Sequence, residues 1–177
     1  MAMTFEENLC WGGIGESQIA KWLRSRGHSV LPIYEKEIDN GKGPRFFTPG
    51  GQIVAPDLFV MPRMEWIEAK HKSVFTWHRK TQRWVTGIDL NHYEEYKRAR
   101  TESGCKVFLM FLHRLSTPDA RDLRHGCPAV CPTGLFAGDL DRLQNEENHR
   151  HDNWGRHGMV YWAVGRLKKM AEIEDMS

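Results

Sequence analysis

Apolar residues at helical spacing mark two stretches of the chain. In residues 16–27, Ile19 and Leu23 fall on one face with polar residues opposite, basic residues occupy the last turn, and a glycine follows. Residues 89–103 show the same spacing, and Gly104 comes directly after them. The pattern predicts an early helix and a central helix.

Shorter apolar runs predict strands, and two later stretches predict further helix. The expected strands are residues 28–34, 53–61, 64–71, 106–112 and 158–163. The expected later helices are residues 137–146 and 164–173. The run 106–112 is almost continuously apolar, which is typical of a strand buried on both faces. The connection between the second and third strands is short enough for a hairpin.

The order of these elements predicts the fold class. A helix, several strands, a helix, a strand and a mixed end favour an α/β or α+β fold, in which helices flank a central mixed sheet. The chain has 177 residues, of which 40% are hydrophobic, and this fits one compact domain. We therefore expect a single domain over residues 1–177.

The sequence also bears on whether the protein is inserted in a membrane or secreted. The longest uncharged apolar run, residues 107–112, is far shorter than the roughly 20 residues that cross a bilayer. Residues 1–7 also lack a basic segment that leads into an apolar one. We therefore expect a cytoplasmic protein without a membrane partner. The net charge of +2 neither requires nor excludes a polyanionic partner.

Two neighbouring predicted strands carry charged residues among apolar ones. Asp57 lies in the first strand, and Glu68 and Lys70 share one face of the second. A hairpin would bring these three side chains together. Carboxylate and carbonyl oxygens suit Mg²⁺ or Mn²⁺, and an adjacent lysine can orient or deprotonate a metal-bound water, which indicates phosphodiester hydrolysis. The alternative is a surface ladder of salt bridges, with Asp57 as a strand-edge acid.

The first predicted helix adds a third acid. Glu16 precedes Ile19 and Leu23 by three and seven residues, and so lies on the apolar face. A buried carboxylate without a partner costs several kcal/mol, so a metal or a basic residue is expected beside it. The alternative is an acid in the first helical turn that the helix dipole favours.

These residues resemble the PD-(D/E)xK nuclease superfamily. The matching motifs are Pro56-Asp57 and, after ten intervening residues, Glu68-Ala69-Lys70. The early helix with Glu16, followed by a strand, is similar to the opening of Holliday-junction resolvases and of related phage and bacterial nucleases. The resemblance spans residues 12–112 and leaves residues 113–177 as a C-terminal extension.

The resemblance implies a fold, a metal site and a catalytic lysine. The fold would be a restriction-endonuclease-like core, a mixed four-stranded sheet flanked by helices. Glu16, Asp57, Glu68 and the carbonyl of Ala69 would be the metal ligands. Lys70 would be the base that positions the attacking water.

The helix after the motif is also part of the resemblance. Many recombination-type members carry a glutamine and a tyrosine four residues apart in this helix, and this chain has His92 and Tyr96 at that spacing. The departure leaves the subfamily open. The resemblance is to phage and prophage nucleases as much as to cellular ones.

The segment that follows the motif is basic and aromatic. It contains no acidic residue between Glu68 and Asp89. Cations that bind phosphates and indoles that stack on bases favour a flap facing nucleic acid. The candidate contacts, together with His92 and Tyr96, are Lys72, Trp77, Arg79, Lys80 and Arg83. The alternative is a solvated basic hairpin whose tryptophans pack on the core.

Cysteines and histidines suggest a second metal hypothesis. Cys127 and Cys131 have the spacing of a zinc-ligand pair, and several histidines lie nearby in the sequence. Some relatives of the nuclease superfamily hold an iron-sulfur cluster on four cysteines, and this chain also contains Cys10 and Cys105. The alternative is that the thiols are buried and residues 149–157 form a polar surface loop.

These observations predict a nuclease that uses Mg²⁺ or Mn²⁺ and acts on DNA, including branched DNA or DNA ends. A homodimer is expected if both strands are cut at one position. The first alternative is a non-catalytic nucleic-acid-binding module that retains the fold. The second is a structural or regulatory protein built around a metal held by cysteines and histidines.

Overall fold

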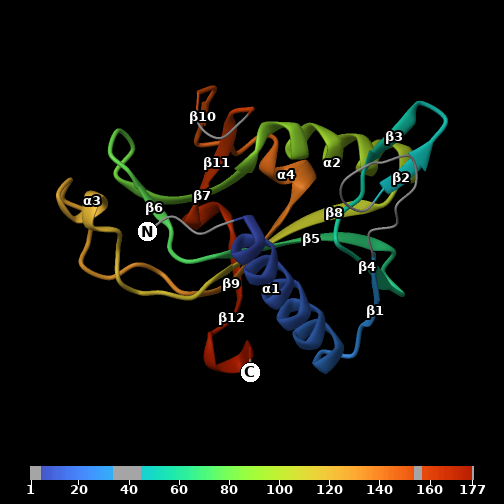
Figure 1. Ribbon diagram of the computed structural model, residues 1–177, viewed down its shortest axis with the longest axis horizontal. Coiled ribbons are helices and arrows are strands. Elements are labelled where there is room, and N and C mark those ends of the chain that lie inside the picture. Colours follow the sequence, from blue (N-terminus) through green and yellow to red (C-terminus); the bar gives the residue numbers. More distant parts are fainter. Residues whose placement is uncertain (1–4, 34–44, 154–156, 177) are drawn as a thin grey trace.

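A six-stranded mixed sheet forms the middle layer of the protein (Figure 1). The computed structural model describes residues 5–33, 45–153 and 157–176, with side chains from residue 12 onward. In spatial order the strands are β1 (Ser29–Pro32), β4 (Leu58–Met61), β5 (Glu65–Lys72), β8 (Lys106–His113), β9 (Gly134–Asp139) and β12 (Lys168–Ala171). Strands β5 and β8 are parallel, and the other neighbouring pairs are antiparallel.

Two long helices cover opposite faces of this sheet. They are α1 (Phe5–Ser25) and α2 (Leu90–Ser103). Alternate side chains of β8 pack on the α1 side and on the α2 side of the sheet, because successive strand side chains point to opposite faces. Leu109 is in the buried cluster that contains Tyr96 of α2, and Leu112 is in the cluster that contains Ile19 of α1. The expected central mixed sheet flanked by helices is confirmed, as is the burial of both faces of β8.

A second sheet and a hairpin complete the fold. The second sheet is antiparallel, in the order β10 (His149–His151), β11 (Met159–Ala163), β7 (Arg83–Asp89) and β6 (Thr76–His78). Strands β2 (Arg45–Thr48) and β3 (Gly51–Val54) form the hairpin. Trp84 and Trp162 of the second sheet join the buried cluster beneath α2. The second sheet therefore shares the core on the α2 face.

Residues 137–146 are a wrong helix prediction. They begin within β9, and the helical part is the short α4 (Leu140–Leu143). Strand β9 pairs with β8 on one side and β12 on the other, and these hydrogen bonds outweigh the local helical spacing. Asp139 then ends the strand and caps α4, because its side chain accepts a hydrogen bond from the Asp141 amide at 3.0 Å.

Three other predicted boundaries change. Residues 164–173 are not a helix but a 3₁₀ turn, Val164–Arg166, followed by the edge strand β12. The predicted strand 53–61 divides into β3 and β4 around Pro56, which has no amide hydrogen for a strand ladder. Helix α1 begins at Phe5 rather than near residue 16. The remaining short helices are α3 (Ala120–Leu123) and the 3₁₀ turn Glu174–Met176.

None of the helices among the described residues combines the length and the apolar character that a membrane-spanning helix needs. This agrees with the sequence, in which the apolar runs are short.

Gly15 sets how closely α1 approaches the sheet. A Cβ added at this position would overlap the Cβ of His71 in β5 and lie 2.9 Å from its Cγ. Glycine lets the helix backbone rest directly on the strand, and this contact places the next residue, Glu16, at the sheet. At Gly13, two residues earlier on the same helix, a Cβ would meet nothing within 4 Å.

We predict opposite effects for alanine at these two glycines. Gly15→Ala should destabilise the protein by about 1–3 kcal/mol, because the methyl group overpacks the contact between α1 and β5. Gly13→Ala should stabilise it by about 0.5–1 kcal/mol, because alanine is the better helix former. Urea unfolding followed by circular dichroism measures both changes. Equal stabilisation by the two substitutions would contradict the close approach of α1.

Candidate functional site

The hairpin of β4 and β5 brings Asp57 next to the second half of β5. Leu58, the first residue of β4, pairs with Ile67, so Asp57 lies opposite Glu68. The Ala69 amide donates a hydrogen bond to Oδ2 of Asp57 at 2.9 Å. The hairpin expected from the sequence is confirmed, and it holds Asp57 against the strand that carries Glu68 and Lys70.

Glu68 is a buried acid with one ionic partner. Its exposed fraction is 1%, and its Oε1 contacts the Nζ of Lys70 in a salt bridge. The Tyr96 hydroxyl also interacts with the Glu68 carboxylate, but neither Glu68 oxygen has a further hydrogen bond of normal geometry among the described residues. A buried carboxylate with so few polar contacts is unfavourable unless another positive charge compensates it.

Glu16 joins the same group of charges from α1. Burial raises the pKa of its carboxyl, the Lys70 ammonium opposes this shift, and the Glu68 carboxylate adds to it. Lys70 is therefore a basic residue within electrostatic reach of this helical acid. The carboxyl groups of Asp57, Glu68 and Glu16 therefore all interact electrostatically with the Lys70 ammonium.

Asp57 titrates far above its ordinary range. Burial raises its pKa to about 8, the Glu68 carboxylate adds to the rise, and Lys70 opposes it. Burial lowers the pKa of Lys70, but the Glu68 and Asp57 carboxylates raise it more, so it lies above its ordinary value. Lys70 is therefore a protonated ammonium at neutral pH, and Asp57 holds a proton in the absence of a further cation.

Helix α2 brings two aromatic side chains to this cluster. The side chain of Asp89 caps the helix by accepting a hydrogen bond from the Asn91 amide at 2.9 Å. Burial and the Glu68 and Asp57 charges raise the pKa of Tyr96 well above its ordinary value. Burial and the Lys70 charge lower the pKa of His92, while Glu68 opposes the shift. Both side chains therefore stand within electrostatic reach of Glu68.

The residues at this cluster fit a hard divalent cation. Glu68 is buried and Asp57 is half-buried, both depend on the charge of Lys70, and they offer oxygen ligands of the kind that Mg²⁺ and Mn²⁺ take. Ala69 directs its amide to Asp57, and in an extended strand its carbonyl points to the same side. Among the described residues, no group of three or more His, Cys, Asp or Glu side chains is placed to hold a metal ion, and Oε1 of Glu68 is in contact with the Nζ of Lys70.

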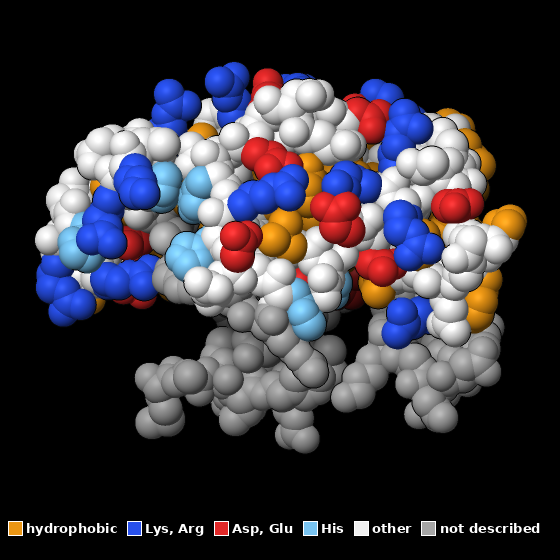
Figure 2. Space-filling model, turned by 90° about the horizontal axis from the view of Figure 1, so that it is seen from above, with side chains coloured by type: hydrophobic (Ala, Val, Ile, Leu, Met, Phe, Trp, Pro, Cys, Tyr) orange, Lys and Arg blue, Asp and Glu red, His pale blue; other side chains and the backbone are white. Residues whose placement is uncertain are grey.

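The proposed nucleic-acid contacts lie in different environments. Arg79, Lys80 and Arg83 are exposed on the hairpin of β6 and β7. Trp77 packs edge-to-face on Trp84, with ring centroids 5.1 Å apart, as the core-packing alternative expects. Figure 2 shows Lys, Arg and His side chains gathered at the end of the molecule where Figure 1 places this hairpin and α3.

Lys72 differs from the exposed cations of the hairpin. It lies two residues beyond Lys70 on the same face of β5 and is partly buried. Burial and the Lys70 charge lower the pKa of Lys72 to about 8. Its charge at neutral pH is therefore sensitive to any anion or cation that enters the neighbouring cluster.

The cysteines form no metal centre in the part of the chain that the structure describes. Cys105, Cys127 and Cys131 are free thiols, and Cys131 is 1% exposed. The described residues contain no group of three or more His, Cys, Asp or Glu side chains that could hold a metal ion. The side chain of Cys10 lies outside the described residues.

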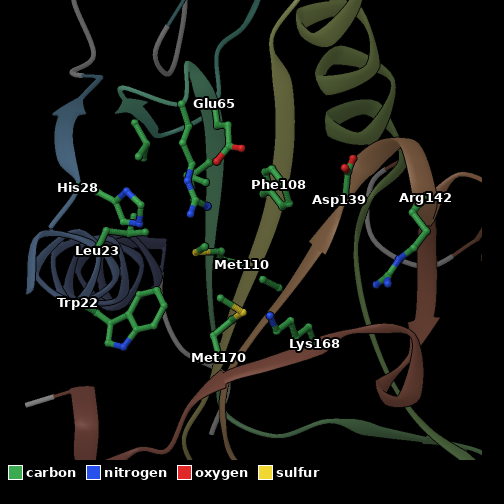
Figure 3. Close-up of a pocket in the computed structure, with 14 residues that line it drawn as sticks. Trp22, Leu23, His28, Glu65, Phe108, Met110, Asp139, Arg142, Lys168 and Met170 are labelled. Atoms are coloured by element: carbon green, nitrogen blue, oxygen red, sulfur yellow. The ribbon is translucent and has the colours of Figure 1, made fainter. Parts of the chain in front are cut away.

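A separate cavity lies on the α1 face of the large sheet (Figure 3). Its volume is about 410 Å³, and its apolar lining includes Trp22, Phe108 and Met170. None of the clustered residues Asp57, Glu68 and Lys70 is among the residues that line it. The cavity is therefore a gap between α1 and β12 and not part of the acidic cluster.

Sequence reasoning missed a stack of rings in the second sheet. His78 and His149 stack with ring centroids 3.8 Å apart, and His149 stacks on Tyr161 at 4.6 Å. The expectation of a loop over residues 149–157 is wrong at its start, because His149–His151 is strand β10. The pairing of β10 with β11 could not be seen in the local sequence.

Comparisons with known proteins include a likeness to a solved structure. No protein family matches the chain, and no curated protein matches it. The structure of a Holliday junction resolvase from the archaeal hyperthermophile Archaeoglobus fulgidus is similar over 84% of this chain and 86% of that chain, with a TM-score of 0.46 and 8% identity. Structural similarity at this level supports no conclusion about chemistry. Any functional assignment therefore rests on the geometry of the acidic cluster itself.

Because the pKa of Asp57 is raised, we predict that Asp57→Asn becomes more stable relative to wild type as the pH rises. Between pH 4 and 8 the folded protein holds a proton at Asp57 that the unfolded chain releases, so this group lowers stability as the pH rises. Without divalent metal, the melting temperature of Asp57→Asn relative to wild type should rise by at least about 3 °C from pH 5 to pH 9. Differential scanning calorimetry measures the difference, and a constant difference would contradict the raised pKa.

Proposed function

We propose that the protein is a divalent-metal-dependent nuclease of the PD-(D/E)xK type that hydrolyses phosphodiester bonds in DNA. The observation that carries this proposal is the convergence of Asp57, Glu68 and Lys70 at the end of the β4–β5 hairpin. A surface salt-bridge ladder would leave these groups solvated, whereas Glu68 is 1% exposed. Burial of acids beside a lysine is typical of functional sites.

The metal ligands in this proposal are Asp57, Glu68 and the carbonyl of Ala69. A bound Mg²⁺ or Mn²⁺ supplies a water of lowered pKa and offsets charge on the phosphate. Glu16 stands at the edge of the same group, where its carboxylate can orient a water molecule or take part in binding the ion. The raised pKa of Asp57 supports this assignment, because a cation would relieve the repulsion from Glu68.

Lys70 acts as a positioning cation in this proposal. It is protonated beside three carboxyl groups, so it donates hydrogen bonds to a water molecule or a phosphate oxygen and does not accept a proton in this state. Tyr96 keeps its hydroxyl proton and can donate it in a hydrogen bond. His92 is neutral at pH 7, because its pKa is lowered, and offers one acceptor and one donor.

The basic hairpin supports a nucleic acid as the substrate. Arg79, Lys80 and Arg83 follow the catalytic strand directly in the chain and are exposed. Cations at this place would hold the phosphate backbone while the acidic cluster binds the metal and the reacting phosphate. A junction or a DNA end is the substrate form we propose, and a homodimer would serve if both strands are cut.

One observation favours the alternative of a non-catalytic nucleic-acid-binding module. Lys70 contacts Glu68 directly, and the described side chains do not already form a three-ligand group. A lysine that permanently replaced the metal would leave a binding surface without hydrolysis. The two hypotheses differ in whether a divalent ion binds.

Cleavage assays test the catalytic assignment. We expect wild type with Mg²⁺ or Mn²⁺ to cut at least one of a labelled linear duplex, single strand, flap and four-way junction, and EDTA to abolish cutting. Asp57→Asn and Lys70→Ala should each lower the rate by at least about 100-fold. The matched controls are Asp152→Asn and Lys21→Ala, which replace exposed residues and should leave the cleavage rate unchanged. Equal rates in Asp57→Asn and wild type would refute the assignment.

Metal binding can be measured without activity. Saturating Mn²⁺ at about ten times its dissociation constant stabilises the folded state by about 1.4 kcal/mol, which corresponds to a rise of about 3–6 °C in melting temperature. The rise should be present in wild type and absent in Asp57→Asn. An equal rise in both proteins would place the ion elsewhere and favour the non-catalytic alternative.

A further inference from the structure

A second cavity opens between the second sheet and α3. Its volume is about 420 Å³. It is lined by His78 and the following turn, by β10 and Tyr161, and by the segment around α3. We call it the histidine cleft. It lies at the end of the molecule where Figure 2 shows Lys, Arg and His side chains together, and it is distinct from the acidic cluster.

The floor of the histidine cleft is a stack of three aromatic rings. His78 and His149 are parallel within 7°, and His149 and Tyr161 within 3°. Tyr161 is 6% exposed, so it closes the inner end of the stack and His78 forms the outer end. A flat ring at the open end of a stack presents a face on which another planar ring can lie.

One amide bridges the two histidines. The Nδ2 of Asn148 lies 3.1 Å from Nδ1 of His78 and 2.8 Å from Nδ1 of His149. The Nδ1 of His78 also lies 2.8 Å from the Oγ1 of Thr81. Burial lowers the pKa of both histidines, and it lowers that of His149 to about 4. At neutral pH both imidazoles of the stack are therefore uncharged.

The rim of the histidine cleft is positively charged. Arg79 and Lys80 come from the turn after β6, and Arg121 comes from α3, where 48% of its side chain is exposed. Arg150 also lines the cleft, but it pairs with Glu147 at 2.7 Å.

The cleft contains one acidic side chain among its lining residues. Asp122 is 3% exposed, accepts a hydrogen bond from the Trp77 amide at 2.9 Å and lies 3.9 Å from Arg121. Asp122 is therefore paired with Arg121, whereas Arg79 and Lys80 are exposed, so the rim as a whole remains positive and favours an anion. His125 and His151 add further polar groups at the rim.

The geometry points to a ligand that is planar at one end and anionic at the other. We propose that the histidine cleft binds an unpaired nucleotide of the substrate strand, with its base on the ring stack and its phosphate on Arg79, Lys80 and Arg121. This rests on the proposed nuclease function. A paired base is stacked within its duplex and cannot lie on His78, so the cleft would select single-stranded or frayed segments.

The cleft is close enough to the acidic cluster to share one strand with it. Thr76, where β6 begins, follows Lys70 by six positions in the chain. Six residues of fully extended backbone span at most about 20 Å. A strand that passes from the acidic cluster along the end of β5 therefore reaches the cleft within a few nucleotides.

Binding in EDTA tests the cleft without cleavage. The probes are a fluorescein-labelled oligothymidylate of about 20 nucleotides and an abasic oligomer of the same length, both measured by fluorescence anisotropy. His78→Ala should weaken binding of the oligothymidylate about tenfold and leave the abasic oligomer unchanged, because only stacking is lost. Arg121→Ala should weaken both and reduce the slope of log affinity against log salt by about 0.7.

Matched variants separate the cleft from general effects. His78→Phe keeps a flat ring and should preserve the difference between the two oligomers. Arg24→Ala removes an equal charge from the exposed last turn of α1 and should have no effect. Arg121 lies on α3 with about half of its side chain exposed. If circular dichroism shows that His78→Ala is unfolded, Arg121→Ala still tests the cleft.

Three results would overturn the cleft proposal. They are an absence of oligothymidylate binding by wild type, equal binding by Arg121→Ala and wild type, and equal losses in Arg121→Ala and Arg24→Ala. Cleavage assays run in parallel separate the two proposals. Cleavage without cleft-dependent binding would refute the cleft alone, and cleft-dependent binding without cleavage would refute the nuclease function alone.

Discussion

The confinement of three carboxyl groups around one half-buried lysine is the constraint on which the candidate site depends. Asp57 and Glu68 meet where water is largely excluded, so their repulsion is weakly screened. Lys70 offsets only part of it. The protein must therefore either retain a proton on Asp57 or bind another cation, and this choice links the stability of the fold to the occupancy of the site.

Three elements distant in the sequence impose this confinement. Strand β5 is interior to the sheet, with β4 on one side and β8 on the other, and its Glu68 lies on a covered face with 1% of its surface exposed. Gly15 brings α1 down onto β5 and carries Glu16 with it. The cap at Asp89 starts α2 where Tyr96 lies over the acids. The acidic cluster is a product of tertiary packing, although its core comes from a local hairpin.

The sequence predicted those features that depend on neighbours in the chain. Alternation in β5 separated Glu68 and Lys70 from Ala69, and the short link to β4 predicted the approach of Asp57. Features that depend on distant partners were missed or wrong. Residues 164–173 have helical spacing, but Lys168–Ala171 form an edge strand because β9 offers a ladder. The stack of His78 on His149 likewise needs β10, whose pairing no local pattern reveals.

The parallel pairing of β5 with β8 has a consequence for the order of folding. The hairpin of β4 and β5 closes a very short loop, whereas β8 joins β5 only after residues 73–105 have been brought back across the sheet. Local contacts form faster than distant ones, because loop closure costs less entropy. We expect Asp57 and Glu68 to meet while still hydrated and to lose their water only when β8 and α2 dock. Dehydration of the acid pair would then be a late event, and any cation present at that moment could be enclosed as the core closes.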